Sequence, residues 1–116
     1  MSESQVNVFV RPEAEAYIVT AEGRVDSTNA HELDATLSQL ISDGNKDLVL
    51  DLAKITYMSS AGLRAIVSAL RSAKRRNGDV RIGAASERVV EVFSLAGLTP
   101  LFQMFDDVET AVNSFK

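Results

Sequence analysis

Strand-like and helix-like segments alternate along almost the whole chain, and few folds are compatible with that pattern. The first two strand-like segments, residues 6–10 and 15–21, are separated by Arg11-Pro12-Glu13, which interrupts the pattern as a turn would. They are close enough in sequence to form an antiparallel hairpin. From residue 30 onward helices separate the strands, which favours parallel strands joined by right-handed crossovers.

The apolar patterns of the later segments predict which of their residues are buried. Leu48-Val49-Leu50 is an unbroken apolar run, typical of a strand that is covered on both faces. Residues 80–84 alternate as a further strand, and residues 102–105 could form a short last one. Four segments place apolar residues on one helical face: Leu33, Leu37, Leu40 and Ile41; Leu63, Ile66, Val67, Leu70 and Ala73; Val89, Val90, Val92 and Phe93; Val108, Ala111, Val112 and Phe115.

These segments predict an α/β fold with the order ββαβαβαβα, a mixed sheet of four or five strands and about four helices packed on it. The length of 116 residues fits a single domain, residues 1–116. Several helix ends are also marked. Asn29 with Glu32, and Asp106 with Glu109, have capping-box spacing, and Ser27 is a rival cap for the first helix. Ser86 can cap the third helix.

Composition argues against several classes of protein. There is no cysteine, so disulfides and thiol chemistry are excluded. The net charge of −4 argues against direct nucleic-acid binding, and Lys74-Arg75-Arg76 is interpreted as a solvated helix end. No apolar run approaches the ~18–20 residues of a membrane span. The N-terminal residues Met1–Gln5 do not resemble a signal peptide, so we expect a cytoplasmic protein without a membrane partner.

The motifs of an enzyme are missing. His31 is the single histidine, and Asp26 and Asp51 lie on separate segments with nothing in the sequence to bring them together. There is no nucleophile elbow, no metal-binding spacing and no phosphate-binding glycine loop. We therefore expect no catalytic residue, no metal, no cofactor and no enzymatic activity. A flavodoxin-like enzyme or nucleotide-binding protein is the least favoured alternative, because a fold alone supplies no activity.

Residues 55–66 carry the strongest functional signal. Ser59 and Ser60 lie where an apolar segment ends and an amphipathic helix begins. A serine at such a place is usually a helix cap, but an exposed cap hydroxyl is also accessible to a kinase. A phosphate on a serine there suits the positive end of the helix and changes the charge of the surrounding surface. Gly62 would let a bulky group approach closely.

The segment Val49-Leu50-Asp51-Leu52, followed by Ile55–Leu63, resembles the signature of STAS domains, specifically the bacterial anti-sigma factor antagonists. The resemblance extends over nearly the full length and includes Gly23–Asp26 and Val92–Leu98. It implies that Ser60 is phosphorylated by a partner kinase. Ser59 occupies the place of a frequent aspartate and is a rival acceptor. Asp26 matches an acidic position near the serine, and Ala61 replaces a frequent Ser or Thr.

The resemblance implies a binding switch. Unphosphorylated, the chain would bind a serine kinase that is also the anti-sigma factor, of GHKL-like ATPase fold, and so free the sigma factor. A serine phosphatase would restore this form. The alternative is an interaction subunit of a transporter or signalling scaffold without a phosphorylation cycle. The residues expected to contact the partner are Asp26, Ser59, Ser60, Ala61, Gly62 and Arg64.

Overall fold

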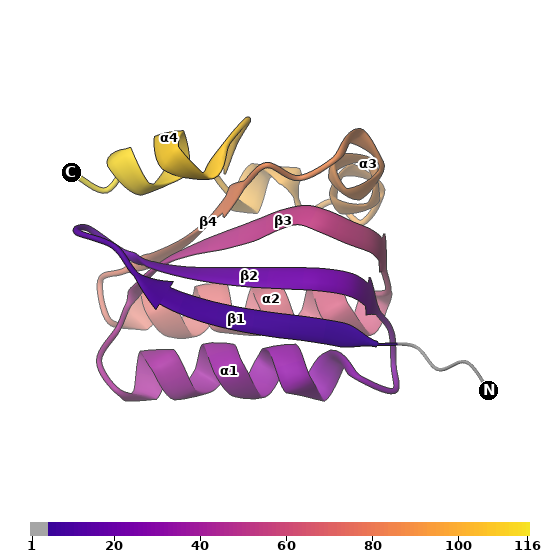
Figure 1. The fold of residues 1–116 in the computed structure, drawn as a ribbon, viewed down its shortest axis with the longest axis horizontal. Coiled ribbons are helices and arrows are strands. Elements are labelled where there is room, and N and C mark those ends of the chain that lie inside the picture. Colours follow the sequence, from indigo (N-terminus) through magenta and orange to yellow (C-terminus); the bar gives the residue numbers. More distant parts are fainter. Residues whose placement is uncertain (1–4) are drawn as a thin grey trace.

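A five-stranded mixed sheet runs through the centre of the molecule, with helices on both of its faces (Figure 1). The computed structural model describes residues 5–116. Residues 1–4, which belong to the segment used above to argue against a signal peptide, lie outside the described part. The elements are β1 (Val6–Pro12), β2 (Tyr17–Val25), α1 (Ala30–Ser42), β3 (Asp47–Met58), α2 (Ser60–Arg75), β4 (Asp79–Gly83), α3 (Glu87–Leu95), a short 3-10 helix η1 (Thr99–Leu101), β5 (Met104–Phe105) and α4 (Val108–Asn113).

The strands lie side by side in sequence order, β1-β2-β3-β4-β5. β1 and β2 form the predicted antiparallel hairpin, and every later pair is parallel. The predicted fold class and element order are therefore confirmed. At the end of β2 and β3, Val25 pairs with Met58, so the residues after these two strands emerge next to each other.

The two faces of the sheet are covered differently. α1 and α2 lie together on one face, and α4 lies over the other (Figure 1). Leu48 and Leu50 of β3 point into the large core under α1 and α2, whereas Val49 between them points into a small cluster under α4. The apolar run in β3 is thus buried on both sides, as predicted. In residues 5–116 no helix is long and apolar enough to cross a membrane.

One predicted cap residue has the expected position but no capping bond, and another is wrong by one residue. Asn29 precedes α1 but its side chain makes no cap bond; its amide instead accepts from the N–H of Asp26 and donates to the carbonyl of Arg24. Asn29 is buried, so its polar atoms are used to hold the loop after β2. At α4 the cap is Asp107, which accepts from the N–H of Thr110 at 2.7 Å, and Asp106 lies one residue too early.

Other local predictions hold. Ser86 accepts a hydrogen bond from the N–H of Val89 and so caps α3. In α1, Leu33, Leu37 and Ile41 are buried. In α2, Leu63, Ile66 and Leu70 are buried, while Val67 is half-buried at the edge of the stripe. The last strand is shorter than expected, because Phe102 packs into the core against Phe93 before β5 begins.

Candidate functional site

The junction between β3 and α2 presents two adjacent serines in different environments. Ser59 is the N-cap of α2: its Oγ accepts from the N–H of Gly62 at 3.3 Å, and its own N–H donates to the carbonyl of Val25. Its side chain is half-buried. Ser60 is the first residue of the helix and is exposed. The local pattern that predicted a cap therefore applies to Ser59, and it leaves Ser60 open to solvent.

Gly62 makes this arrangement possible. A Cβ at Gly62 would lie 2.7 Å from Cγ1 of Val25 and 2.5 Å from Sδ of Met58, both far inside normal contact distance. Because Gly62 has no side chain, the first turn of α2 packs directly on the ends of β2 and β3. The sequence prediction that a bulky group approaches this glycine is confirmed, and the group is the side-chain pair Val25 and Met58.

Asp26 lies at the same end of the sheet as the serines. It directly follows Val25, just as Ser59 directly follows Met58, and Val25 and Met58 are paired. One carboxylate oxygen of Asp26 accepts from both the N–H and the hydroxyl of Thr28, the latter at 2.6 Å. The loop is held further by Asn29, whose Oδ1 accepts from the N–H of Asp26. The structure thus brings Asp26 beside the β3–α2 junction in a fixed loop.

Ala61 and Arg64, near the start of α2, differ in exposure. Ala61 is half-buried, packs against the main core and lines the groove between α1 and α2. Arg64 is exposed and lines two surface grooves: one between α2 and the segment after α3, and one between α1 and α2. The first of these grooves has a volume of about 620 Å³ and also includes Ser60. Ser60 and Arg64 therefore share a concave surface.

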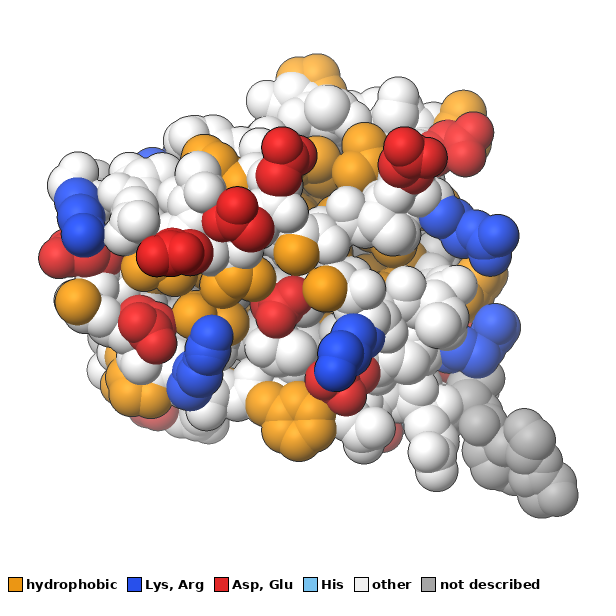
Figure 2. Space-filling model, turned by 45° about the horizontal axis from the view of Figure 1, so that its top comes forward, with side chains coloured by type: hydrophobic (Ala, Val, Ile, Leu, Met, Phe, Trp, Pro, Cys, Tyr) orange, Lys and Arg blue, Asp and Glu red, His pale blue; other side chains and the backbone are white. Residues whose placement is uncertain are grey.

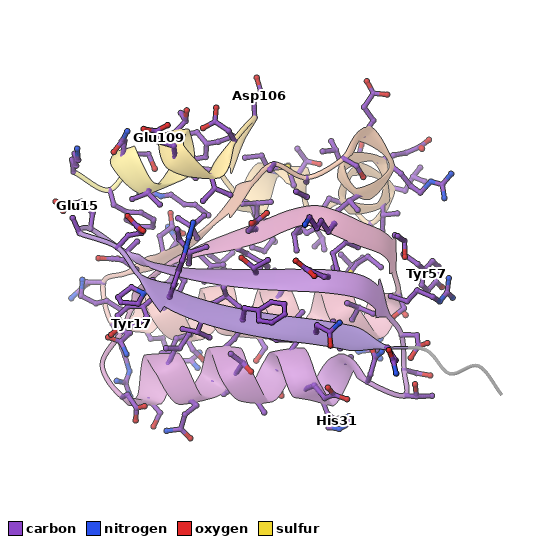
Figure 3. The ribbon with its side chains drawn as sticks, in the orientation of Figure 1. Glu15, Tyr17, His31, Tyr57, Asp106 and Glu109 are labelled. Carbon is purple, nitrogen blue, oxygen red and sulfur yellow. The ribbon has the colours of Figure 1, made fainter. Side chains whose placement is uncertain are left out.

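Sequence reasoning missed a pair of side chains at this end of the sheet. The guanidinium of Arg24 lies 4.5 Å from the centre of the Tyr57 ring, a cation–π contact. Figure 3 shows Tyr57 at the end of the sheet opposite to Glu15 and Tyr17. Arg24 and Tyr57 are paired in the sheet, one step before Val25 and Met58. Arg24 lies two residues before Asp26, and Tyr57 lies two residues before Ser59. Had β2 and β3 been aligned as parallel neighbours on these two site residues, the sequence would have predicted this pair.

The other residues considered for chemistry do not converge. Asp51 accepts from the hydroxyl of Thr20 and the N–H of Ala53. It pairs with Thr20, which lies six residues before Asp26 on β2, so about 15–20 Å of strand separates Asp51 from Asp26. His31 is exposed near the start of α1 (Figure 3) and lines the groove between α1 and α2 together with Arg64. Within residues 5–116 no three His, Asp or Glu side chains come together as a metal site would require.

Comparison with known proteins places the chain in a family. A profile of the STAS domain matches residues 5–111. BtrV of Bordetella bronchiseptica, which bears the name of an anti-sigma factor antagonist, is 32% identical over 99 residues, covering 85% of this chain and 85% of BtrV. The structure of an anti-sigma factor antagonist from Mycobacterium paratuberculosis superposes with a TM-score of 0.87 at 19% identity, covering 96% of this chain and 94% of that one.

SpoIIAA, an anti-sigma factor antagonist of Bacillus, shares the fold in two states. Its unphosphorylated form superposes with a TM-score of 0.81 at 19% identity, covering 93% of this chain and 95% of SpoIIAA. Its phosphorylated form gives 0.76 at 19% identity, with 95% and 100% covered. Anti-sigma factor antagonists are binding proteins and not enzymes, in agreement with the missing catalytic motifs. The chain belongs to the STAS domain family and, within it, to the anti-sigma factor antagonists.

Proposed function

We propose that this chain is an anti-sigma factor antagonist whose binding is switched by phosphorylation of Ser60. In the unphosphorylated form it binds a serine kinase of GHKL-like fold that is also the anti-sigma factor, and the sigma factor is released. Phosphorylation dissociates the complex, and a serine phosphatase removes the phosphate and restores the binding form. Both partners act on the chain in the cytoplasm, and residues 1–116 act as one STAS domain.

The observation that carries the proposal is that Ser60 is exposed, whereas the neighbouring Ser59 is the N-cap of α2. The Ser60 hydroxyl opens onto solvent at the start of α2, so a kinase can reach it without opening the helix. The Ser59 hydroxyl already accepts a hydrogen bond from Gly62. A kinase acting on Ser59 would have to break that cap, which is worth ~0.5–2 kcal/mol in helices of this kind. Ser60 is therefore preferred as the acceptor.

The magnitudes are adequate for a switch. A phosphoserine carries about −1.5 to −2 charge at neutral pH. The N-terminus of α2 stabilises that charge within the domain by ~0.3–1 kcal/mol, so the fold tolerates it. At a docked interface, a like charge or a poorly solvated one costs several kcal/mol. Reversing a population from 1:99 to 99:1 needs about 5.5 kcal/mol of differential affinity, which is of the same order.

Three features at the same sheet end complete the surface proposed to meet the partner. Asp26 is held beside the serines because its carboxylate accepts from the N–H of Thr28 and its own N–H donates to Oδ1 of Asn29. Arg64 projects from the first turn of α2, and Arg24 lies over Tyr57. SpoIIAA, which has this fold, is known in a phosphorylated and an unphosphorylated form. These observations support a rigid docking surface on which one modified hydroxyl alters recognition.

The direct test is phosphorylation by the cognate kinase with ATP, read by intact mass. The unmodified chain should gain one phosphate, Ser59→Ala should gain one as well, and Ser60→Ala should gain none. If Ser60→Ala is phosphorylated at the normal rate, Ser60 is the wrong site and Ser59 becomes the first suspect.

A binding measurement completes the test. Ser60→Asp should weaken kinase binding, whereas Ser60→Ala should retain it. Asn113→Asp provides the matched control, because Asn113 is exposed on α4, away from α2, and the substitution adds the same charge. Equal losses for Ser60→Asp and Asn113→Asp would show that net charge, and not the site, controls binding.

One observation favours a second candidate function. Ser59 stands where the resembling antagonists often have an aspartate, so a kinase that reads this acid would not recognise the site. The chain would then be an interaction subunit of a transporter or signalling scaffold without a phosphorylation cycle. Absence of any added phosphate on the unmodified chain, together with capture of a membrane transport complex by Ser60→Ala, would favour this function over the first.

A further inference from the structure

The groove that contains Ser60 continues along the whole length of α2. A second groove of about 430 Å³ follows it, lined by Leu70, Lys74 and Leu101. The two grooves share Val67, Arg71 and Arg75 in their walls, so they form one surface from Ser60 to Lys74. At 1.5 Å of rise per residue this surface is about 21 Å long. We call it the α2 groove.

The base of the α2 groove is apolar. α2 contributes Leu63, Val67 and Leu70, and the segment after α3 contributes Leu98 and Leu101. Leu101 is 48% exposed, and Leu95, next to the groove residue Ala96, is 81% exposed. Large apolar side chains left open in one place mark surfaces that bind other molecules. The apolar surface is therefore available to an apolar occupant.

The rim of the α2 groove is positively charged. Arg64, Arg71, Lys74 and Arg75 line it, and no Asp or Glu of residues 5–116 lines either of its two parts. Lys74 lies 3.5 Å from Asp79, but the ion pairs found in the described chain do not involve Arg64, Arg71 or Arg75. In a protein with a net charge of −4, this is a local reversal of sign. The occupant should be acidic.

We propose that the α2 groove binds an acidic amphipathic segment of a partner protein, with apolar side chains on its base and carboxylates on its rim. A helix of about 14 residues has the length of the groove. Arginine pairs with carboxylates through two parallel hydrogen bonds, which suits a rim of three arginines. Nucleic acid fits less well, because no aromatic side chain of residues 5–116 lines the groove to stack on bases.

The α2 groove explains how a phosphate on Ser60 would weaken partner binding; this step rests on the proposed function. Ser60 and Arg64 are four residues apart on one helix, so their side chains are neighbours. A phosphate on Ser60 would compete with the carboxylates of the occupant for Arg64. It would also place a negative charge at one end of a groove that binds a negative segment. Phosphorylation would thus weaken binding without any change of fold.

The test is a selection of random 16-residue peptides displayed on phage against the unmodified chain, with counter-selection on Arg71→Glu/Arg75→Glu. Enriched peptides should carry Asp and Glu together with large apolar residues at helical spacing. Their binding should shift the amide NMR signals of Val67, Leu98 and Leu101. The double variant should lose at least about tenfold in affinity. Arg11→Glu/Arg88→Glu, an equal charge change at two exposed arginines outside the groove, should lose little.

Three outcomes would overturn the groove proposal: no enrichment over the counter-selected pool, peptides whose signals map elsewhere, or equal binding of a 16-nucleotide single-stranded DNA or anionic vesicles to the groove. None of these needs the kinase, so the proposed function is judged separately by the phosphorylation of Ser60. If selected peptides bind the groove but Ser60→Asp does not weaken their binding relative to Asn113→Asp, the coupling to Ser60 is wrong.

Discussion

The two faces of the sheet differ in how closely they are packed. α1 and α2 cover one face with helices of 13 and 16 residues, over a core that includes the fully buried Leu37, Leu50 and Ile66. The opposite face is covered by α4, a helix of six residues, over a small cluster around Ile18 and Val49. The site lies on the densely packed side, because α2 both carries Ser60 and contributes to the large core.

The helices α2 and α4 also differ in the charges around them. α2 has four basic side chains along its outer groove and no carboxylate in its sequence. The start of α4 instead carries Asp106, Asp107 and Glu109, and acidic side chains are spread over this face of the molecule (Figure 2). A rigid basic surface next to an exposed serine can respond to a phosphate. Basic side chains also occur on the face shown in Figure 2, but they are interspersed with acidic ones.

A matched pair of substitutions tests the difference in packing and should have the largest effect. Ile82→Ala creates a cavity in the large core, and Ile18→Ala creates one in the small cluster under α4. Truncations of this kind cost ~2–5 kcal/mol, depending on how far the surroundings collapse. We expect Ile82→Ala near the upper end and Ile18→Ala near the lower end, measured by urea denaturation. Equal losses would remove the packing contrast between the faces.

Gly62→Ala tests how tightly α2 is held on the dense face. Overpacking costs ~1–3 kcal/mol, and the better helix propensity of alanine returns up to about 1 kcal/mol. The net effect should be a loss of about 1–2 kcal/mol in unfolding free energy, since the new Cβ would meet Val25 and Met58. In a Val25→Ala background the cost of Gly62→Ala should fall, because one of the two crowding side chains is then removed. A cost that is unchanged in that background would exclude crowding against Val25 as its cause.

Ser59→Ala and Ser60→Ala should separate structure from recognition at adjacent positions. Ser59→Ala removes the cap of α2 and should lower stability by ~0.5–2 kcal/mol. Ser60→Ala removes an exposed hydroxyl and should stay within about 0.5 kcal/mol of the unmodified chain. Thermal denaturation followed by circular dichroism measures both. A larger loss from Ser60→Ala than from Ser59→Ala would reverse the assignment of cap and modification site.

The cap of α4 should have the smallest effect, because α4 is short. The backbone N–H of Thr110, and to a lesser extent its side chain, lower the pKa of Asp107 below the ordinary 3.8. A lowered pKa in the folded state contributes stability above the unfolded pKa, and this is lost as the pH falls through the folded value. Asp107→Ala should therefore lower the melting temperature slightly at pH 7 and not at strongly acidic pH. Asp106→Ala, which removes an equal charge without a cap, should have no effect at either pH.

Much of the fold could be predicted because its signals are local. The spacing of Leu33, Leu37 and Ile41 along α1 is read directly from the chain, and so is the two-sided burial of Leu48-Val49-Leu50. Ser60 and Gly62 were recognised in the same way, from a strand end next to a helix start. The predicted role of Asn29 was wrong because a buried amide satisfies whichever backbone groups surround it, and those depend on the folded loop.

The amino-acid order established which segments become strands and helices, where α2 begins and which hydroxyls stand there, because each of these depends on residues within a few positions of one another. The folded chain established what lies beside them. Pairing of Val25 with Met58 brings Asp26 to Ser59, and packing of the segment after α3 against α2 turns a row of arginines into a groove. Contacts between residues tens of positions apart depend on strand register and helix packing, which local periodicity does not encode.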